Sequence, residues 1–243
     1  MITANLKVVS SPDAAELAAE REKALQNQHQ WFGSKSYAQH GDDLILLSIF
    51  QRLDIKKPSY LDIGAYHPFE LSNTALLYER GSRGINVEPN PKFIDAFHKY
   101  RPEDINVNVG ISASAGRRRF YIHHPTSGLN SCLETQVNCW GMVDQFDIDV
   151  MTVGDVVDQY AGGVFPDLLS VDAEGLDAEI LSSIDYTQTA PKVICAEVIA
   201  APNENSAEIK GLLELRGYVP LFWSVANIFF IKADYFSTYW RCK

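Results

Sequence analysis

Residues 60–68 read YLDIGAYHP, and this stretch sets the fold class of the chain. An apolar run of strand length ends at Asp62 and Gly64, and an amphipathic stretch of helical length follows within a few residues. The same alternation of short apolar runs and helical stretches recurs along the rest of the chain. Strands that alternate with helices predict a parallel sheet that is covered by helices on both faces.

The pattern divides the chain into predicted strands and helices. Strands are expected at 59–64, 84–89, 105–111, 117–125, 167–175 and 192–198. Helices are expected at 40–53, 72–81, 91–100, 178–184 and 206–217. The last two apolar runs, 218–225 and 227–236, are separated by too few residues for a helical crossover. They are therefore expected to pair antiparallel at the end of the sheet.

The composition limits which classes of partner and which cellular compartment are expected. The chain has 243 residues, a formal net charge of −10 and 46% hydrophobic residues, which suits one globular domain with a short appendage. This acidic balance argues against nucleic acid as a partner, and the basic cluster Arg117–Arg119 is interpreted as a solvated turn. No paired cysteine spacing and no apolar run long enough to span a membrane are seen, so a cytoplasmic protein is expected.

The N-terminal residues read as a separate helical extension. Ser11, Pro12 and Asp13 form a helix start, and a run of good helix formers follows them. Its alanine-rich face suggests a homodimer contact. Residues 1–36 are therefore predicted to be this extension, and residues 37–243 are predicted to be the main domain.

The first strand-to-helix turn indicates which ligand the sheet holds. Ligands of open parallel sheets bind beyond the carboxyl ends of the strands. A dinucleotide would require GxGxxG there, but this turn has one glycine and the carboxylate of Asp62, which repels a diphosphate and attracts a cation. Glu88 ends the next strand, where an acid typically binds a ribose diol. A ribose without a pyrophosphate points to S-adenosylmethionine, although both acids could instead cap helices or solvate loop ends.

Several motifs together resemble one family. They are YAQHGDDLIL, YLDIGAYHPFELSNTALLYERGSRGINVEPNP, INVNVGIS, DVMTVGDVV, LLSVDAEGLDAEIL and VICAEV, which cover roughly residues 37–231. The chain resembles the FkbM family of S-adenosylmethionine-dependent methyltransferases. The resemblance implies a Rossmann-like class I methyltransferase fold, with a mostly parallel seven-stranded sheet, an antiparallel C-terminal strand and helices on both faces.

The resemblance also implies residues that bind the cofactor. Asp62, Gly64, Ala65 and Tyr66 would form the floor under its methionine part. Glu88 would bind the ribose and Gly110 would lie beside the adenine. The start of the first helix would serve the cofactor carboxylate through Ser72, Asn73 and Thr74. Gln39 is also placed at the cofactor. Asp42 stands where the family pattern has Glu, so this aspartate is expected either to contact ligand or to cap a helix.

Methyl transfer to a hydroxyl requires alignment and the removal of a proton, by a base or through a metal ion. In the family's strand order the acids Asp172, Glu174 and Glu197 converge on one crevice with His67. Two interpretations stay open. Either Asp172, Glu174 and Glu197 bind Mg²⁺ or Mn²⁺, with His67 making Fe²⁺ a further option. Or Asp172 accepts the cofactor amino group and Glu174 or His67 is a metal-free catalytic base. His67 could alternatively brace the turn, and Glu197 could be a hydrogen-bonded acid at a strand end.

The irregular segment 126–146 is the candidate lid over the acceptor. Its Ser127, Asn130, Ser131, Asn138 and Trp140 are side chains that hydrogen-bond or stack on sugars, although an ordinary surface loop is the alternative. His123 and His124 are interpreted as loop residues. The expected function is O-methylation of a sugar hydroxyl in a glycan, a lipopolysaccharide, a capsule or a nucleotide sugar. The alternatives are methylation of another small hydroxylated metabolite and a non-catalytic module that binds S-adenosylmethionine.

Overall fold

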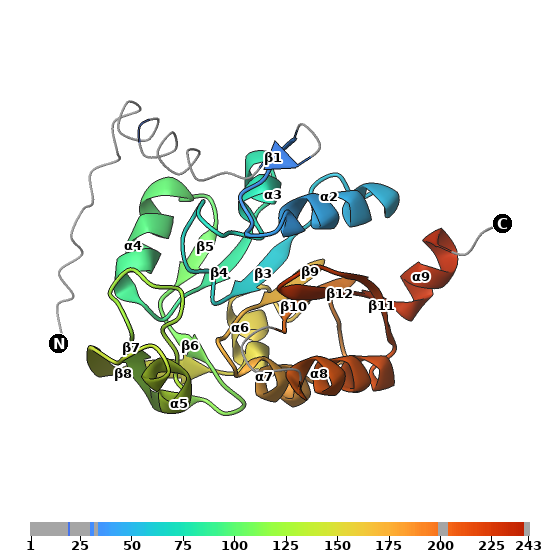
Figure 1. The fold of residues 1–243 in the computed structure, drawn as a ribbon. Helices are drawn as coiled ribbons and strands as arrows, with labels where there is room; N and C mark the ends of the chain where they lie inside the picture. Colours follow the sequence, from blue (N-terminus) through green and yellow to red (C-terminus); the bar gives the residue numbers. More distant parts are fainter. Residues whose placement is uncertain (1–18, 20–29, 32–33, 199–203, 241–243) are drawn as a thin grey trace.

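The structure is a computed structural model that describes residue 19 and residues 30–31, 34–198 and 204–240. Its centre is a seven-stranded sheet with the order β11-β12-β10-β9-β3-β4-β5 (Figure 1). The strands are β3 (Tyr60–Ile63), β4 (Gly84–Val87), β5 (Ile105–Val107), β9 (Leu168–Val171), β10 (Val193–Glu197), β11 (Tyr218–Trp223) and β12 (Asn227–Lys232). β12 runs antiparallel to both of its neighbours, and the other pairs are parallel. This confirms the predicted Rossmann-like sheet.

Helices cover both faces of this sheet, as the alternation predicts (Figure 1). One face packs on α6 (Val153–Tyr160), α7 (Asp177–Ser183) and α8 (Glu204–Leu215) in the largest hydrophobic cluster. The other face packs on α2 (Asp42–Arg52), with α9 (Ala233–Tyr239) at its edge. The remaining helices along the sheet are α3 (Ala75–Glu79) and α4 (Pro91–Tyr100). The apolar faces of these helices therefore account for the burial of both sides of the sheet.

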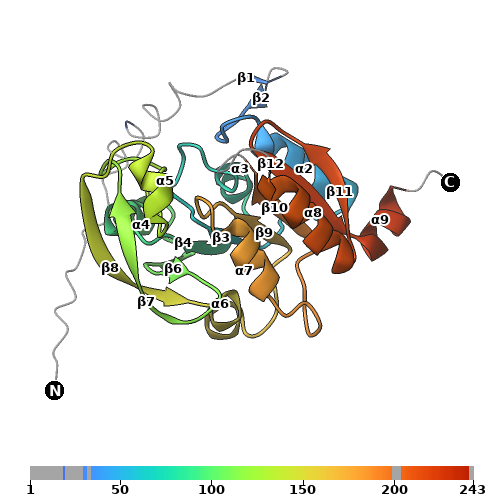
Figure 2. The ribbon, with the colours of Figure 1, turned by 60° about the horizontal axis from the view of Figure 1, so that its bottom comes forward.

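A second, three-stranded sheet with the order β6-β8-β7 was not predicted from the sequence. It consists of β6 (Gly110–Ile111), β7 (Gly116–Ile122) and β8 (Asp144–Met151), and it lies with α5 (Glu134–Asn138) on the opposite side of the molecule from α8 and α9 (Figure 2). The predicted strand 105–111 is in fact two strands in different sheets. The chain leaves the main sheet at Asn108, whose amide donates hydrogen bonds to the carbonyls of Glu88 and Pro89.

The basic cluster Arg117–Arg119 lies within strand β7, which confirms the strand predicted from Arg117 and corrects the interpretation of the cluster as a solvated turn. Arg117 pairs with Asp149, and Arg119 with Asp147, both on the neighbouring strand β8. The prediction missed β8 because its exposed face carries these acids, and an alternating charged strand gives a weak apolar signal.

The two ends of the chain differ from the predictions. The apolar run 227–236 is not one strand, because β12 ends at Lys232 and α9 begins at Ala233. Within the predicted extension 1–36, β1 (Gln30–Trp31) and β2 (Ser34–Lys35) form an antiparallel pair. The helix predicted from Ser11, and the dimer contact assigned to it, fall outside the described residues apart from residue 19. Among the described helices, none combines the length and the apolar character that crossing a bilayer requires.

Candidate active site

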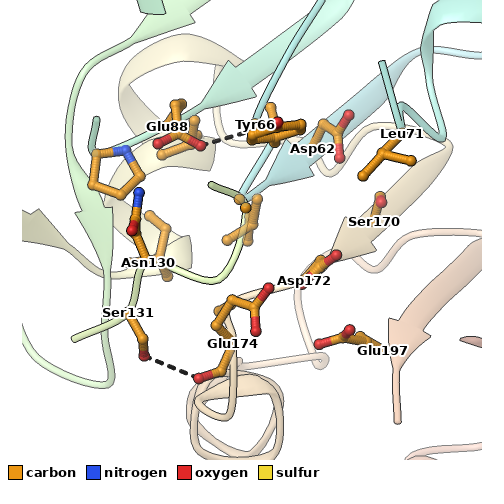
Figure 3. Close-up of a pocket in the computed structure, with 18 of the residues that line it drawn as sticks. Asp62, Tyr66, Leu71, Glu88, Asn130, Ser131, Ser170, Asp172, Glu174 and Glu197 are labelled. Carbon is orange, nitrogen blue, oxygen red and sulfur yellow. Dashed lines mark hydrogen bonds between the residues drawn. The ribbon is translucent and has the colours of Figure 1, made fainter. Parts of the chain in front are cut away.

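A cavity of about 460 Å³ opens beyond the carboxyl ends of the parallel strands (Figure 3). Its walls come from the ends of β3, β4, β9 and β10, the start of β12, the start of α2 and residues 127–132. The predicted site residues that line it are Gln39, Asp62, Gly64, Ala65, Tyr66, Ser72, Asn73, Glu88, Gly110, Asp172, Glu174 and Glu197. The fold therefore gathers at one edge of the sheet residues that are up to 158 positions apart in the sequence, from Gln39 to Glu197.

Gly64 is required by the close approach of two turns. Its φ is +72°, a left-handed conformation, and a Cβ atom at this position would lie 1.7 Å from the carbonyl oxygen of Asp172. The backbone N–H groups of Gly64 and Ala65 both donate to the carbonyl of Val87. The single glycine of YLDIGAYHP thus allows the turn after β3 to lie against the turn after β9.

Glu88 is buried and oriented by the same turn. Its Oε2 accepts a hydrogen bond from the backbone N–H of Tyr66 at 2.9 Å, and its Oε1 accepts one from Asn90 at 2.7 Å. Tyr66 adopts a left-handed backbone with φ of 55° and packs edge-on against Phe93. Burial raises the pKa of Glu88 to about 8 although both hydrogen bonds lower it. Each carboxylate oxygen keeps a further lone pair at the pocket wall, as the predicted ribose contact requires.

Asp62 is linked to a buried arginine that the sequence analysis did not identify. Thr74 Oγ1 donates to Asp62 Oδ2 at 2.6 Å, and Arg101 Nη2 donates to Thr74 Oγ1 at 3.1 Å. Arg101 is fully buried and also binds Asp104 and the hydroxyl of Tyr60. Thr74 itself does not line the pocket, and its hydroxyl is used by Asp62. A lone arginine after a helix carries no sequence signal for this role.

Replacing Arg101 with Met is expected to lower the free energy of unfolding by about 3 to 5 kcal/mol, because Asp104 is then left buried without its counterion. The measurement is chemical denaturation. Arg83→Met is the matched control, because Arg83 pairs with Glu103 where both side chains are about half exposed. This control should lose about 1 kcal/mol or less. Equal losses in the two variants would contradict a special role for the buried pair.

Three carboxylates form a cluster in the pocket, which we call the acid triad: Asp172, Glu174 and Glu197. One oxygen of each lies within 4.8 Å of the others, and Figure 3 shows the three side chains together. Asp172 Oδ1 and Glu197 Oε2 are buried and find no donor among the described residues, although the two carboxyl groups lie close enough to share a proton. Burial, together with neighbouring acid charges, raises the pKa of all three carboxyl groups well above the ordinary range. The acid triad therefore favours a bound proton or cation.

The turn that carries Asp172 and Glu174 is fixed by Asp177, a residue the sequence analysis did not assign. Asp177 Oδ1 accepts from the N–H of Ala173 at 3.0 Å, and Oδ2 accepts from Gly175 at 3.2 Å. Glu174 has a left-handed backbone with φ of 50°. The sequence signal was present, since an acid in the first turn of a helix commonly binds the free N–H groups there.

His67 is held within its own turn. Its Nδ1 accepts hydrogen bonds from the backbone N–H groups of Phe69 and Glu70, and it does not line the pocket. Burial lowers its pKa to about 4. This placement agrees with the alternative that His67 braces the turn, and it gives no support to His67 as a catalytic base or metal ligand.

The candidate lid is more ordered than a loop. Within 126–146 the chain forms α5 and enters β8, and only the part at 127–132 lines the pocket. Asn138 is exposed and Trp140 is 61% exposed, so the structure does not bring these two to the cavity. His123 and His124 do not line it either.

The segment 127–132 is tied to the turns below it. Tyr66 donates its hydroxyl to the carbonyl of Thr126 at 3.0 Å, and Ser131 Oγ donates to the carbonyl of Glu174 at 3.0 Å. Asn130 accepts from His123 N–H and donates to the Ser127 carbonyl. The candidate lid is thus anchored to residues beside Glu88 and within the acid triad.

Comparison with protein families and solved structures identifies the family of this chain. Residues 62–220 match the model of the methyltransferase FkbM domain. The curated proteins gave no match. A precorrin-6y C5,15-methyltransferase from Geobacter metallireducens GS-15 aligns with 14% identity and a TM-score of 0.42, over 82% of this chain and 90% of that one. Cofactor-bound Rv0187 from MTB aligns with 14% identity and a TM-score of 0.39, over 94% and 93%. Because the family model covers well over half of its length, this chain belongs to the FkbM methyltransferase domain family.

Proposed function

We propose that this S-adenosylmethionine-dependent methyltransferase methylates a hydroxyl group of a sugar, in a glycan, a lipopolysaccharide, a capsule or a nucleotide sugar. The observation that carries the proposal is the acid triad, which lies in the same cavity as Glu88. A sulfonium donor and a hydroxyl acceptor both suit such a cavity, since the first is a cation and the second must lose a proton.

The cofactor is assigned to the side of the pocket formed by β3 and β4. Glu88 would bind the ribose diol, and Asp62 with Gly64, Ala65 and Tyr66 would lie beneath the methionine part. Among the described residues that line the cavity there is no Lys or Arg. A pyrophosphate would meet several carboxylates here and no cation, whereas the sulfonium and ammonium groups of S-adenosylmethionine would be attracted.

The residues of the acid triad would hold and deprotonate the acceptor. The hydroxyl oxygen must lie in line with the sulfur–methyl bond, so positioning supplies much of the rate. A carboxylate of the triad accepts the hydroxyl proton as the oxygen–methyl bond forms and the sulfur–methyl bond breaks. Asp172 and Glu174 are the candidates for this base, because they end the strand next to the one that carries Asp62.

The acid triad also fits a divalent metal ion. Its donors are three carboxylates, and the unpartnered oxygens of Asp172 and Glu197 leave coordination positions unused. Such oxygen donors suit Mg²⁺ or Mn²⁺. His67 neither lines the cavity nor belongs to this group of carboxylates, so the argument for Fe²⁺, which depended on an imidazole ligand, loses its support. A bound ion would supply Lewis-acid activation of the acceptor hydroxyl.

The metal is tested by removal and by mutation. EDTA is expected to lower methyl transfer at least tenfold, and Mn²⁺ should restore it. Glu197→Ala should abolish Mn²⁺ binding in calorimetry, because it removes one of three ligands. Glu134→Ala, an exposed acid outside the cavity, should bind Mn²⁺ as the wild type does. Full activity in EDTA would instead favour a metal-free base at Asp172 or Glu174.

The function itself is tested by methyl transfer from radiolabelled S-adenosylmethionine to a panel of sugars and other small hydroxylated metabolites. Transfer to a sugar hydroxyl is the expected result. Transfer only to non-sugar metabolites would replace the sugar by the second acceptor class. Cofactor binding in calorimetry without transfer to any acceptor would favour a binding module, and tighter binding of NAD than of S-adenosylmethionine would contradict the proposal.

A further inference from the structure

The acid triad continues into a row of polar side chains that reaches the start of α2. Glu197 on β10 lies directly opposite Asn227 on β12 in the antiparallel register. Residues paired in this way project to the same face of a sheet. Asn227 Nδ2 then donates a hydrogen bond to Asp42 Oδ2 at 3.1 Å. Asp172, Glu197, Asn227 and Asp42 thus form one continuous row, which we call the polar row.

The far end of the polar row holds two buried acceptors that lack a donor. Asp42 is fully buried and Asn227 is 5% exposed, yet Asp42 Oδ1 and Asn227 Oδ1 have no hydrogen-bond partner among the described residues. The side chain of Ser224 lies close enough to the Asp42 carboxylate to lower its pKa, but it leaves Asp42 Oδ1 and Asn227 Oδ1 unsatisfied. Both residues line the cavity. Asp42 does not cap α2, since Gly41 occupies the N-cap position. Buried acceptors without partners are costly, and an unsatisfied pair at a cavity wall indicates a ligand that donates hydrogen bonds.

The order of the strands decides which ligand meets this pair. The strands from β4 to β12 lie in the order β4, β3, β9, β10, β12 across the sheet. Glu88 follows β4, Asp172 follows β9, and Asn227 begins β12. Neighbouring strands are about 4.8 Å apart, so the four spacings from β4 to β12 amount to roughly 19 Å. A cofactor bound through its ribose at Glu88 presents its methyl group near the acid triad. Asn227 and Asp42 lie beyond the triad, on the side left for the acceptor.

We propose that Asp42 and Asn227 bind the acceptor through hydroxyl groups next to the one that is methylated, and that they select a neutral polyol over an anionic one. This inference rests on the proposed function. The unpartnered oxygens accept hydrogen bonds and cannot donate them, which matches hydroxyl groups. An acceptor with a phosphate or carboxylate in the cavity would meet the acidic wall without any described Lys or Arg to neutralise it. A nucleotide sugar would therefore have to keep its pyrophosphate outside the cavity.

Binding is measured by ligand-observed NMR titration of protein loaded with S-adenosylhomocysteine. The probes are the methyl glycosides of glucose, galactose, mannose and rhamnose, each compared with its sugar phosphate. The wild type is expected to bind at least one neutral glycoside at least tenfold more tightly than its phosphate. Asp42→Asn should weaken that binding about tenfold, because the variant turns an N–H₂ group toward the hydroxyl while an oxygen remains for Asn227.

Two further variants separate the possible outcomes. Asn227→Ala should weaken the glycoside similarly, and Gln51→Ala, on the exposed part of α2, should not. The affinity for S-adenosylhomocysteine should stay within twofold of the wild type in all three. A loss of that affinity in Asp42→Asn would assign Asp42 to the cofactor and overturn the inference. Unchanged glycoside binding in the folded variants, or equal binding of phosphates, would also overturn it.

The proposed function and the role of Asp42 and Asn227 in binding the acceptor can fail independently of each other. If neutral glycosides bind through Asp42 but the wild type transfers no methyl group to them, the polar row stands and sugar methylation does not. If the wild type methylates a sugar and Asp42→Asn binds that sugar unchanged, sugar methylation stands and the role of Asp42 in binding the acceptor does not.

Discussion

Gly64→Ala is expected to abolish cofactor binding and to lower the free energy of unfolding by about 2 to 5 kcal/mol. Two effects add. The new Cβ atom would lie 1.7 Å from the carbonyl oxygen of Asp172, and alanine would have to adopt a φ of +72°. Relief of this clash must separate the turn after β3 from the turn after β9. Those turns carry Asp62 and Asp172, so the cofactor floor and the acid triad would move apart.

The measurements are urea denaturation and calorimetry with S-adenosylmethionine. Gly211→Ala is the matched control, because Gly211 lies within helix α8 and a Cβ atom there meets nothing within 4 Å. Alanine stabilises helix interiors relative to glycine, so this control should gain about 0.5 to 1 kcal/mol and bind the cofactor normally. Near-normal stability and affinity in Gly64→Ala would show that the two turns do not need their observed contact.

Asp172→Asn is expected to lower the rate of methyl transfer by about 10²-fold to 10⁴-fold, the usual contribution of a positioned acid or base. Asparagine keeps the shape of the side chain but removes the charge that would accept the proton or hold a cation. Asp172 is also the member of the triad that the structure places between Asp62 and Glu197 in strand order. Its loss therefore affects both possible roles, metal ligand and base.

Radiolabel transfer under single-turnover conditions measures this change, and thermal unfolding in EDTA shows whether the variant is damaged. Without a bound ion, Asp172→Asn should be at least as stable as the wild type, because it removes a buried charge beside Glu174 and Glu197. Asp95→Asn, on the exposed side of α4, should change neither property. Transfer within tenfold of the wild-type rate would remove Asp172 from the chemistry.

Much of the main sheet was predictable because its signals are local. The strands β3, β9 and β10 are short apolar runs, and α4 begins with Asn90 as its cap and Pro91 in its first turn, as a helix start should. The second sheet was missed because β8 has one exposed, acidic face that pairs with arginines of β7, and such a strand has little apolar character.

The candidate site was predictable to the extent that it depends on strand ends. The alternation of strands and helices, and the family resemblance that gave the strand order, placed Asp62, Glu88, Asp172 and Glu197 at one edge of the sheet. In the structure all four line one cavity. Carboxyl ends of parallel strands meet at the same edge, so this part of the site follows from topology alone.

The sequence by itself determined the central strands β3, β4, β9 and β10 of the main sheet and the acids that lie at their ends, because hydrophobic periodicity and turn residues act over a few positions. Only the tertiary structure decided that His67 turns back onto its own loop, that Arg101 supports Thr74, and that Asp42 meets Asn227 across 185 positions. These contacts depend on side-chain direction and on packing between distant elements. Side-chain direction and long-range packing produce no periodic pattern in the sequence. They are fixed only in the folded chain, where each buried polar group must find a hydrogen-bond partner.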